Sequence, residues 1–376
     1  MCVGVVVSNP PSGLILTYCL IQTREPPPQN QAARVEIAEC GLENPAPQSR
    51  MMNHPADTAP RNAINRVGGQ SALADFLQQR GNSFPRASGK DINIMTTTRV
   101  LSLHFNPTVR AEGNRKLHQV LGWNDADSLA KKYIDDVRDC SHGYANYEIV
   151  ERVEVDGIPV KEDGFKYTTE SFLKCWRAGS GFHQPDQVSY RQIIKDFDIV
   201  KKINDSTIDE VWLFGPPYAG FYESIMVGND AIWCNAPPLN MDVQRRFVIM
   251  GFNYERGVGE MLEDLGHRAE SMLSKVYEGT RGEANLWERI TRYDKTHPNK
   301  AECGNVHFAP NSLSDYDWGN RREVLSNCDD WLNFPNFKNV TRKMNCSEWG
   351  NGDIRLHHLW WFKHFPHVEG NNWWEY

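Results

Sequence analysis

The sequence predicts an α/β fold between residues 95 and 376, in which a mostly parallel sheet is flanked by helices. The first observation is that short apolar runs alternate along the chain with segments of helical periodicity. The second is that runs such as Val211–Phe214 are apolar at every position, as expected of strands that helices cover on both faces. No internal repeat is visible, which argues against a solenoid or a propeller.

The first half of this region supplies five predicted elements. Val100–Phe105 and Tyr147–Val155 are candidate strands, and the amphipathic helix Asp125–Asp139 separates them. Two further helices are predicted at Thr169–Arg177 and Ser189–Ile203. The alternation of strand and helix is the pattern of a parallel sheet with helices on its faces.

The second half supplies the strands at the centre of the sheet. Val211–Phe214 is ended by Gly215-Pro216-Pro217, because proline lacks the amide hydrogen that a strand needs. Phe247–Phe252 is the next apolar run, and a helix is predicted from Gly257 to Tyr277. A strand followed by a polar loop and a charged helix is a common way for an α/β protein to build a site.

The two ends of the chain differ in composition from this central region. Residues 1–94 are rich in Pro, Gln and Asn, so we expect a low-complexity and mostly disordered extension with one short helical candidate at Ala72–Gln79. Met95 reads as a natural start of the folded domain. From about residue 297 to 376 the text is irregular and aromatic, and seven of the twelve tryptophans lie beyond residue 315. We expect this segment to fold as a cap over the strand ends.

The net charge and the length of the apolar runs argue against two classes of partner, nucleic acids and membranes. A net charge of -7 and a pI near 6.0 argue against a protein that binds nucleic acid through phosphate contacts. No apolar run is long enough for a transmembrane helix, so no membrane partner is expected. The apolar opening lacks a basic segment and is a poor signal peptide.

The cysteines and acceptor tripeptides leave the compartment open. Nine cysteines are an odd number, and their wide spacing contains no C-x-x-C pair of the kind that binds zinc. Acceptor patterns for N-glycosylation at Asn204, Asn339 and Asn345 slightly favour an extracellular location.

The predicted helix Gly257–Tyr277 carries an apolar stripe and an opposite charged face. The charged face comprises Arg256, Glu260, Glu263, His267 and Glu270. Such a face is usually solvated. However, Gly259 and Gly266 are seven residues apart and share a flank on which another backbone could lie close.

If the aromatic segment covers this flank, Glu263 and His267 come together in a desolvated place. The pair is not the H-E-x-x-H zinc helix, so a metal there needs a ligand from elsewhere. His307 is the nearest candidate by residue type. A divalent metal bound by these three residues is thus one hypothesis, although no cofactor motif favours it.

Polar residues also follow the predicted strands. Glu223 lies beyond Val211–Phe214, and Glu255 lies beyond Phe247–Phe252, so both are expected at the carboxyl edge of the sheet. Two carboxylates are the minimum set for general acid and base catalysis and for glycoside cleavage. The residues expected to bind substrate beside them are Asn106, Tyr218, Tyr222, Asn253, Tyr254, Arg256 and Trp318.

The sequence lacks the motifs of serine hydrolases with a nucleophile elbow, of P-loop enzymes and of dinucleotide-binding proteins. The leading hypothesis is therefore a hydrolase of a carbohydrate or related polar polymer, with Glu223 and Glu255 catalytic and His267 and His307 in support. The first alternative is a non-catalytic glycan-binding module. The second alternative is a metal-dependent hydrolase that uses Glu263, His267 and His307.

Overall fold

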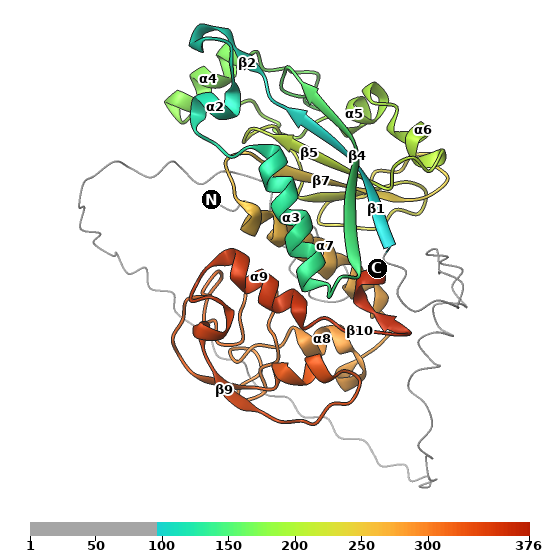
Figure 1. The fold of residues 1–376 in the computed structure, drawn as a ribbon, viewed down its shortest axis with the longest axis vertical. Helices are drawn as coiled ribbons and strands as arrows, with labels where there is room; N and C mark the ends of the chain where they lie inside the picture. Colours follow the sequence, from blue (N-terminus) through green and yellow to red (C-terminus); the bar gives the residue numbers. More distant parts are fainter. Residues whose placement is uncertain (1–95) are drawn as a thin grey trace, which may run out of the picture. The chain divides into compact units, whose positions relative to one another are not determined.

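The computed structural model describes residues 96–376 and confirms the α/β fold. A five-stranded sheet has the order β4-β1-β5-β7-β6, and only β6 runs antiparallel to its neighbour (Figure 1). The predictions for residues 1–94, including the helix at Ala72–Gln79, lie outside the described residues. The sheet strands are β1 (Thr96–Phe105), β4 (Ala145–Val155), β5 (Glu210–Gly215), β6 (Ser224–Val227) and β7 (Phe247–Asn253).

Helices cover both faces of the sheet. On one face, Trp212 and Phe252 pack with residues of α3 and α7, and on the other, Leu213 and Ile249 pack with residues of α5 and α6. The helices are α2 (Leu117–Leu121), α3 (Ala126–Cys140), α4 (Thr169–Ala178), α5 (Tyr190–Asp196), α6 (Ile199–Asn204), α7 (Val258–Val276), α8 (Leu286–Ile290) and α9 (Ile354–Lys363). This three-layer packing explains why the central strands are apolar at every position.

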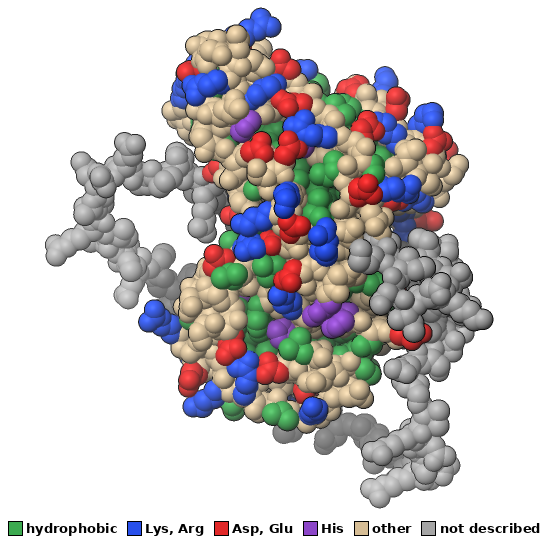
Figure 2. Space-filling view, viewed as in Figure 1, with side chains coloured by type: hydrophobic (Ala, Val, Ile, Leu, Met, Phe, Trp, Pro, Cys, Tyr) green, Lys and Arg blue, Asp and Glu red, His purple; other side chains and the backbone are tan. Residues whose placement is uncertain are grey.

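Short elements complete the described chain. The small strands are β2 (Thr108–Val109), β3 (Arg115–Lys116), β8 (Val324–Ser326), β9 (Arg342–Met344), β10 (His367–Val368) and β11 (Asn371–Asn372). The 3-10 turns are η1 (Arg110–Glu112), η2 (Gly282–Ala284), η3 (Cys328–Asn333), η4 (Cys346–Trp349) and η5 (Trp373–Glu375). No helix of residues 96–376 is long and apolar enough to cross a membrane. Acidic and basic side chains are interspersed on the face that Figure 2 shows.

Three elements differ from the sequence-based prediction. The helix predicted at Ser189–Ile203 is two helices, α5 and α6, because Asp198 has a left-handed φ of 52° that interrupts the helix. The strand β6 was not predicted, since its four residues are too few to give a periodic signal. Nor was α9, in which aromatic and histidine side chains obscure the helical pattern.

Gly259 and Gly266 do provide a close approach on α7. A Cβ atom on Gly259 would lie 2.5 Å from Cγ2 of Ile354, and one on Gly266 would lie 2.6 Å from Cγ2 of Val306. Both contacts come from the C-terminal segment, as the glycine spacing predicts. The chain therefore needs glycine at these positions for packing, since both have ordinary helical backbone.

The C-terminal aromatic segment packs on the helix layer, whereas the sequence predicted a cap over the strand ends. The helix α9 lies against α7 and α3, and Arg355 of α9 binds both carboxylate oxygens of Asp136 on α3, at 2.6 and 2.7 Å. Near the chain end, Trp373 is buried and its Nε1 donates to the hydroxyl of Tyr277, at 3.1 Å. The segment thus forms a further layer beside α7.

Replacing Gly266 with Ala should test this packing. Alanine favours a helix over glycine by about 1 kcal/mol, so the change would stabilise an uncovered helix. We expect destabilisation by about 1–3 kcal/mol instead, because the new methyl group overlaps Val306. Urea unfolding measures the difference, and the double variant G266A/V306A should recover part of the loss. A Gly266→Ala chain more stable than the wild type would contradict the close approach.

Candidate metal centre

Two histidines and one glutamate direct ligand atoms at a common point between α7 and the C-terminal segment. Nε2 of His267 lies 3.1 Å from Nε2 of His307. Oε1 of Glu263 lies 3.2 Å from Nε2 of His307 and 4.0 Å from Nε2 of His267. Two imidazole nitrogens and one carboxylate oxygen thus lie close enough together to bind one metal ion.

Local structure explains how these residues meet. Glu263 and His267 are four residues apart on α7, so their side chains lie on the same side of the helix, one turn apart. His307 reaches them because the preceding residue, Val306, packs against Gly266 of the same helix. The glycine that lets the C-terminal segment approach α7 therefore also brings the third ligand into place.

Each histidine is oriented by a second carboxylate. Nδ1 of His267 lies 3.1 Å from Oε2 of Glu270, and Nδ1 of His307 lies 3.0 Å from Oδ1 of Asp315. A proton on Nδ1 that is donated to a carboxylate leaves the lone pair of Nε2 free. Protein ligands of metals are held in this tautomer by the same kind of hydrogen bond.

Two more polar side chains border the ligand atoms. Oε2 of Glu223 lies 3.9 Å from Nε2 of His267 and accepts a hydrogen bond from the side-chain amide of Asn235. The hydroxyl of Tyr316 donates to Oε1 of Glu263 at 2.8 Å and lies 3.1 Å from Nε2 of His307.

Burial and charge set the electrostatics. Only 7% of the Glu263 side chain and 12% of the His267 side chain are exposed. Burial opposes ionisation of Glu263, but its contact with His307, the nearby His358 and the hydrogen bond from Tyr316 lower its pKa to about 2. Burial raises the pKa of Glu223, whereas burial lowers that of His267 and the nearby carboxylates raise it to about 9.

The donor set fits a divalent transition metal. Bonds of about 2.0–2.1 Å in a tetrahedral site place neighbouring ligand atoms about 3.3 Å apart. The separations from His307 to His267 and to Glu263, 3.1 and 3.2 Å, match this value. The third separation, 4.0 Å, would shorten with a small movement of the Glu263 carboxylate. Because Tyr316 is exposed, one side of the site is open to solvent.

The other predicted catalytic carboxylate, Glu255, lies in the loop after β7. It is half-buried, and burial raises its pKa; Arg256 lowers this pKa and Glu260 raises it, both by less than burial does. Neither Glu223 nor Glu263 is among the charges that shift it. The structure therefore brings together Glu223, His267 and His307, whereas none of these three residues is among the charged neighbours that shift the pKa of Glu255; Arg256 acts on both Glu223 and Glu255.

The residues predicted to bind substrate lie in several places. Asn106 bonds to His118 at 2.8 Å, Tyr218 stacks on Phe182 and Tyr222 stacks on Tyr190. Asn253, Arg256 and Asp264 line a small pocket at the start of α7.

Four of these predicted residues are buried: Asn106, Asn253, Tyr254 and Trp318. Trp318 packs edge-on against Tyr316, with ring centroids 5.2 Å apart. Trp318 therefore helps to position Tyr316 beside the ligand atoms.

Sequence reasoning missed three residues of this site. Asn235, Asp315 and Tyr316 lie in irregular segments that have no motif or periodicity. The single signal for the last two was their position in an acidic and aromatic stretch, Ser314–Trp318, close after His307. The prediction of a solvated charged face on α7 was wrong at Glu263, which the C-terminal segment buries.

Comparison of the chain with models of protein families, with curated proteins and with solved structures finds no match.

Proposed function

We propose that this protein is a metal-dependent hydrolase whose divalent ion is bound by Glu263, His267 and His307. The observation that carries the proposal is the convergence of two Nε2 atoms and one carboxylate oxygen, with both Nδ1 atoms bonded to carboxylates. Two histidines and a glutamate are a common ligand set of hydrolytic zinc sites.

The residues around the ligands suit hydrolysis. A metal bound in such a site lowers the pKa of a bound water and polarises the bond to be cleaved. Glu223 would accept the proton of that water, because its carboxylate is held by Asn235 beside His267. The hydroxyl of Tyr316, on the exposed side, donates to Oε1 of Glu263 and would hold that ligand in place.

Two other hypotheses have less support. A glycosidase with Glu223 and Glu255 needs one protonated and one ionised carboxylate, but burial raises the pKa of both. It would be favoured by activity that survives chelation. A glycan-binding module would present tryptophans to its ligand, yet none of the twelve is exposed in the structure.

Metal analysis of the purified full chain tests the proposal. We expect the His267→Ala variant to bind one equivalent of divalent metal fewer than the wild type, because it loses a ligand. His297→Ala is the matched control, since His297 is exposed and outside the site. A broad hydrolase screen, with and without chelator, then tests the reaction.

The expected activity is lost on chelation and restored by Zn²⁺, Mn²⁺ or Co²⁺. Equal metal content in the wild type and His267→Ala would overturn the metal assignment. Hydrolase activity that survives complete removal of the metal would overturn the mechanism.

A further inference from the structure

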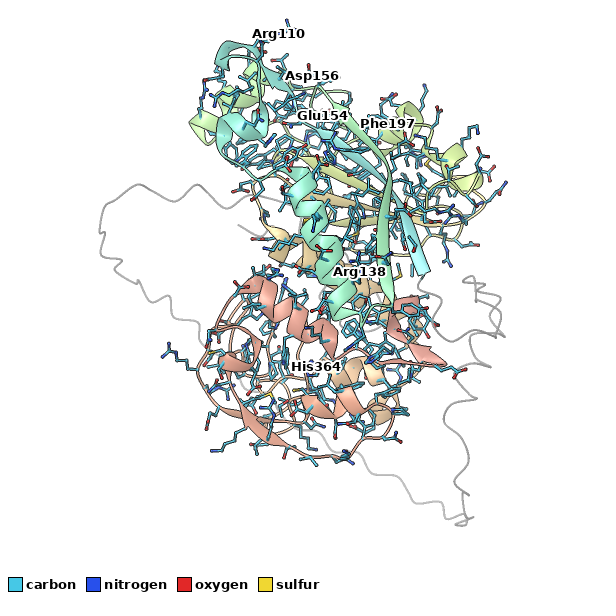
Figure 3. The ribbon with its side chains drawn as sticks, viewed as in Figure 1. Arg110, Arg138, Glu154, Asp156, Phe197 and His364 are labelled. Atoms are coloured by element: carbon cyan, nitrogen blue, oxygen red, sulfur yellow. The ribbon has the colours of Figure 1, made fainter. Side chains whose placement is uncertain are left out.

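A second group of metal-binding side chains lies in the C-terminal segment. Cys303, Cys328 and His364 each offer a ligand atom, and these atoms lie within 4.8 Å of one another. Figure 3 labels His364 among the side chains of this segment. The exposed fractions of the three residues are 0, 0 and 4%.

The histidine is oriented as a metal ligand. Nδ1 of His364 lies 2.7 Å from the carbonyl oxygen of Trp360, one turn earlier in α9. A carbonyl oxygen can only accept, so Nδ1 carries the proton and Nε2 has a free lone pair. This hydrogen bond fixes the tautomer that a metal requires.

A buried thioether lies beside one of the two thiols. Sδ of the buried Met344 lies 3.7 Å from Sγ of Cys328. A metal with bonds of about 2.3 Å to sulfur places neighbouring tetrahedral ligands about 3.8 Å apart. The distance between Met344 and Cys328 is close to this value, so the Met344 thioether is a candidate for a fourth, weaker ligand beside Cys328.

The three ligands come from parts of the chain that have little regular structure. Cys303 lies in a loop, Cys328 begins η3 and His364 follows α9. The strands β8 and β9 between them have only three residues each. A metal ion that links residues distant in sequence closes long loops, and such a link is expected to stabilise the folded state most. Few backbone hydrogen bonds of regular secondary structure stabilise these segments otherwise.

We propose that Cys303, Cys328 and His364 bind a structural, thiophilic d10 metal ion, Zn²⁺ or Cu⁺, that holds the C-terminal segment together. Two thiolates and one imidazole are soft and borderline ligands that favour such ions over Mg²⁺ or Ca²⁺. Because all three residues are buried, the ion would have no open position for substrate, in contrast to the site on α7.

The structural role has a consequence for the site on α7. The C-terminal segment supplies His307 and Tyr316 to that site, and Trp361 of α9 donates through Nε1 to the carbonyl oxygen of Gly304, at 3.0 Å. The buried ion would thus maintain the segment that carries the third ligand of the proposed catalytic metal. The inference about the buried site does not depend on any activity of the protein.

Cobalt substitution of the full chain tests the proposal. The protein is purified under reducing conditions, stripped with a chelator and reloaded with Co²⁺. We expect a strong near-ultraviolet absorption from charge transfer between thiolate and Co²⁺. The Cys303→Ser and Cys328→Ser variants should lose this absorption, whereas His267→Ala should keep it, because the site on α7 contains no sulfur.

Three measurements on the wild type cover the case in which the variants fail to fold. Metal analysis of the wild type as purified should identify bound zinc or copper, and chelation should lower its melting temperature by several degrees. Thiol counting on the wild type before and after chelation should show two buried cysteines becoming reactive. A disulfide between Cys303 and Cys328, or a folded, cobalt-loaded wild type without the charge-transfer absorption, would overturn the proposal.

The two metal proposals fail independently. Loss of the thiolate absorption in the cysteine variants, together with unchanged metal content in His267→Ala, would support the buried ion and overturn the site on α7. No thiolate absorption in the wild type, together with lower metal content in His267→Ala, would support the site on α7 and overturn the buried ion.

Discussion

The Glu263→Gln variant should lose at least about a hundredfold in affinity for the metal at the α7 site, whereas Glu223→Gln should retain that affinity. The first change removes a charged ligand whose oxygen lies 3.2 Å from His307, and an amide is a poor substitute. The second removes a carboxylate that lies 3.9 Å from His267, which we assign to proton transfer. Competition with a chromophoric chelator measures both affinities.

Activity should separate the two variants further. We expect Glu223→Gln to lower kcat by about 10²–10⁴-fold with the metal in place, which is the usual contribution of a general base. Glu278→Gln is the matched control, because Glu278 is exposed just beyond α7 and pairs with Lys275. If Glu223→Gln also releases the metal, Glu223 is a ligand and another group must accept the proton. If Glu263→Gln binds metal as tightly as the wild type, the ligand assignment is wrong.

The Arg268→Met variant should lose about 3–5 kcal/mol of unfolding free energy. Nη1 of Arg268 on α7 lies 2.7 Å from Oε2 of Glu210 on β5, and only 3% of the Glu210 side chain is exposed. Removing one partner of a buried pair leaves the other charge without compensation. Nε1 of Trp212 also donates to Oε1 of Glu210, at 2.8 Å, and Tyr147 is hydrogen-bonded to Arg268. Urea unfolding followed by circular dichroism measures the loss.

Two further variants define the origin of this effect. Glu210→Gln combined with Arg268→Met should be less destabilised than the sum of the single changes, because no unpaired charge is buried. Arg138→Met is the control, since Arg138 lies at the exposed end of α3 (Figure 3), and we expect little change. If the loss of unfolding free energy in the double variant equals the sum of the two single losses, the two side chains stabilise the protein independently and not as a pair.

The sequence was sufficient for four of the five strands of the sheet, β1, β4, β5 and β7, and for the helices α3, α4 and α7. Continuous apolar runs at β5 and β7 and the amphipathic pattern of α3 and α7 are local signals, because burial on two faces or on one stripe dictates residue type directly. The break between α5 and α6 had no such signal, since it depends on the left-handed backbone of Asp198.

Part of the site could also be anticipated from the sequence. Glu263 and His267 are one turn apart on a helix, and the spacing of Gly259 and Gly266 indicated that another segment would cover them. His307 was identified by residue type alone. Nothing in the sequence could give its distance from His267, because their contact joins segments 40 residues apart.

The sequence by itself determined the α/β class and the presence of a charged, glycine-flanked helix, because continuous apolar runs and a helical period of 3.6 residues are local signals. Only the tertiary structure decided which side chains converge. Asp315, Tyr316 and Asn235 come to the α7 site, and Cys303, Cys328 and His364 come together, through packing of an irregular segment. Large aromatic side chains determine that packing by shape and area, and these leave no regular pattern along the chain.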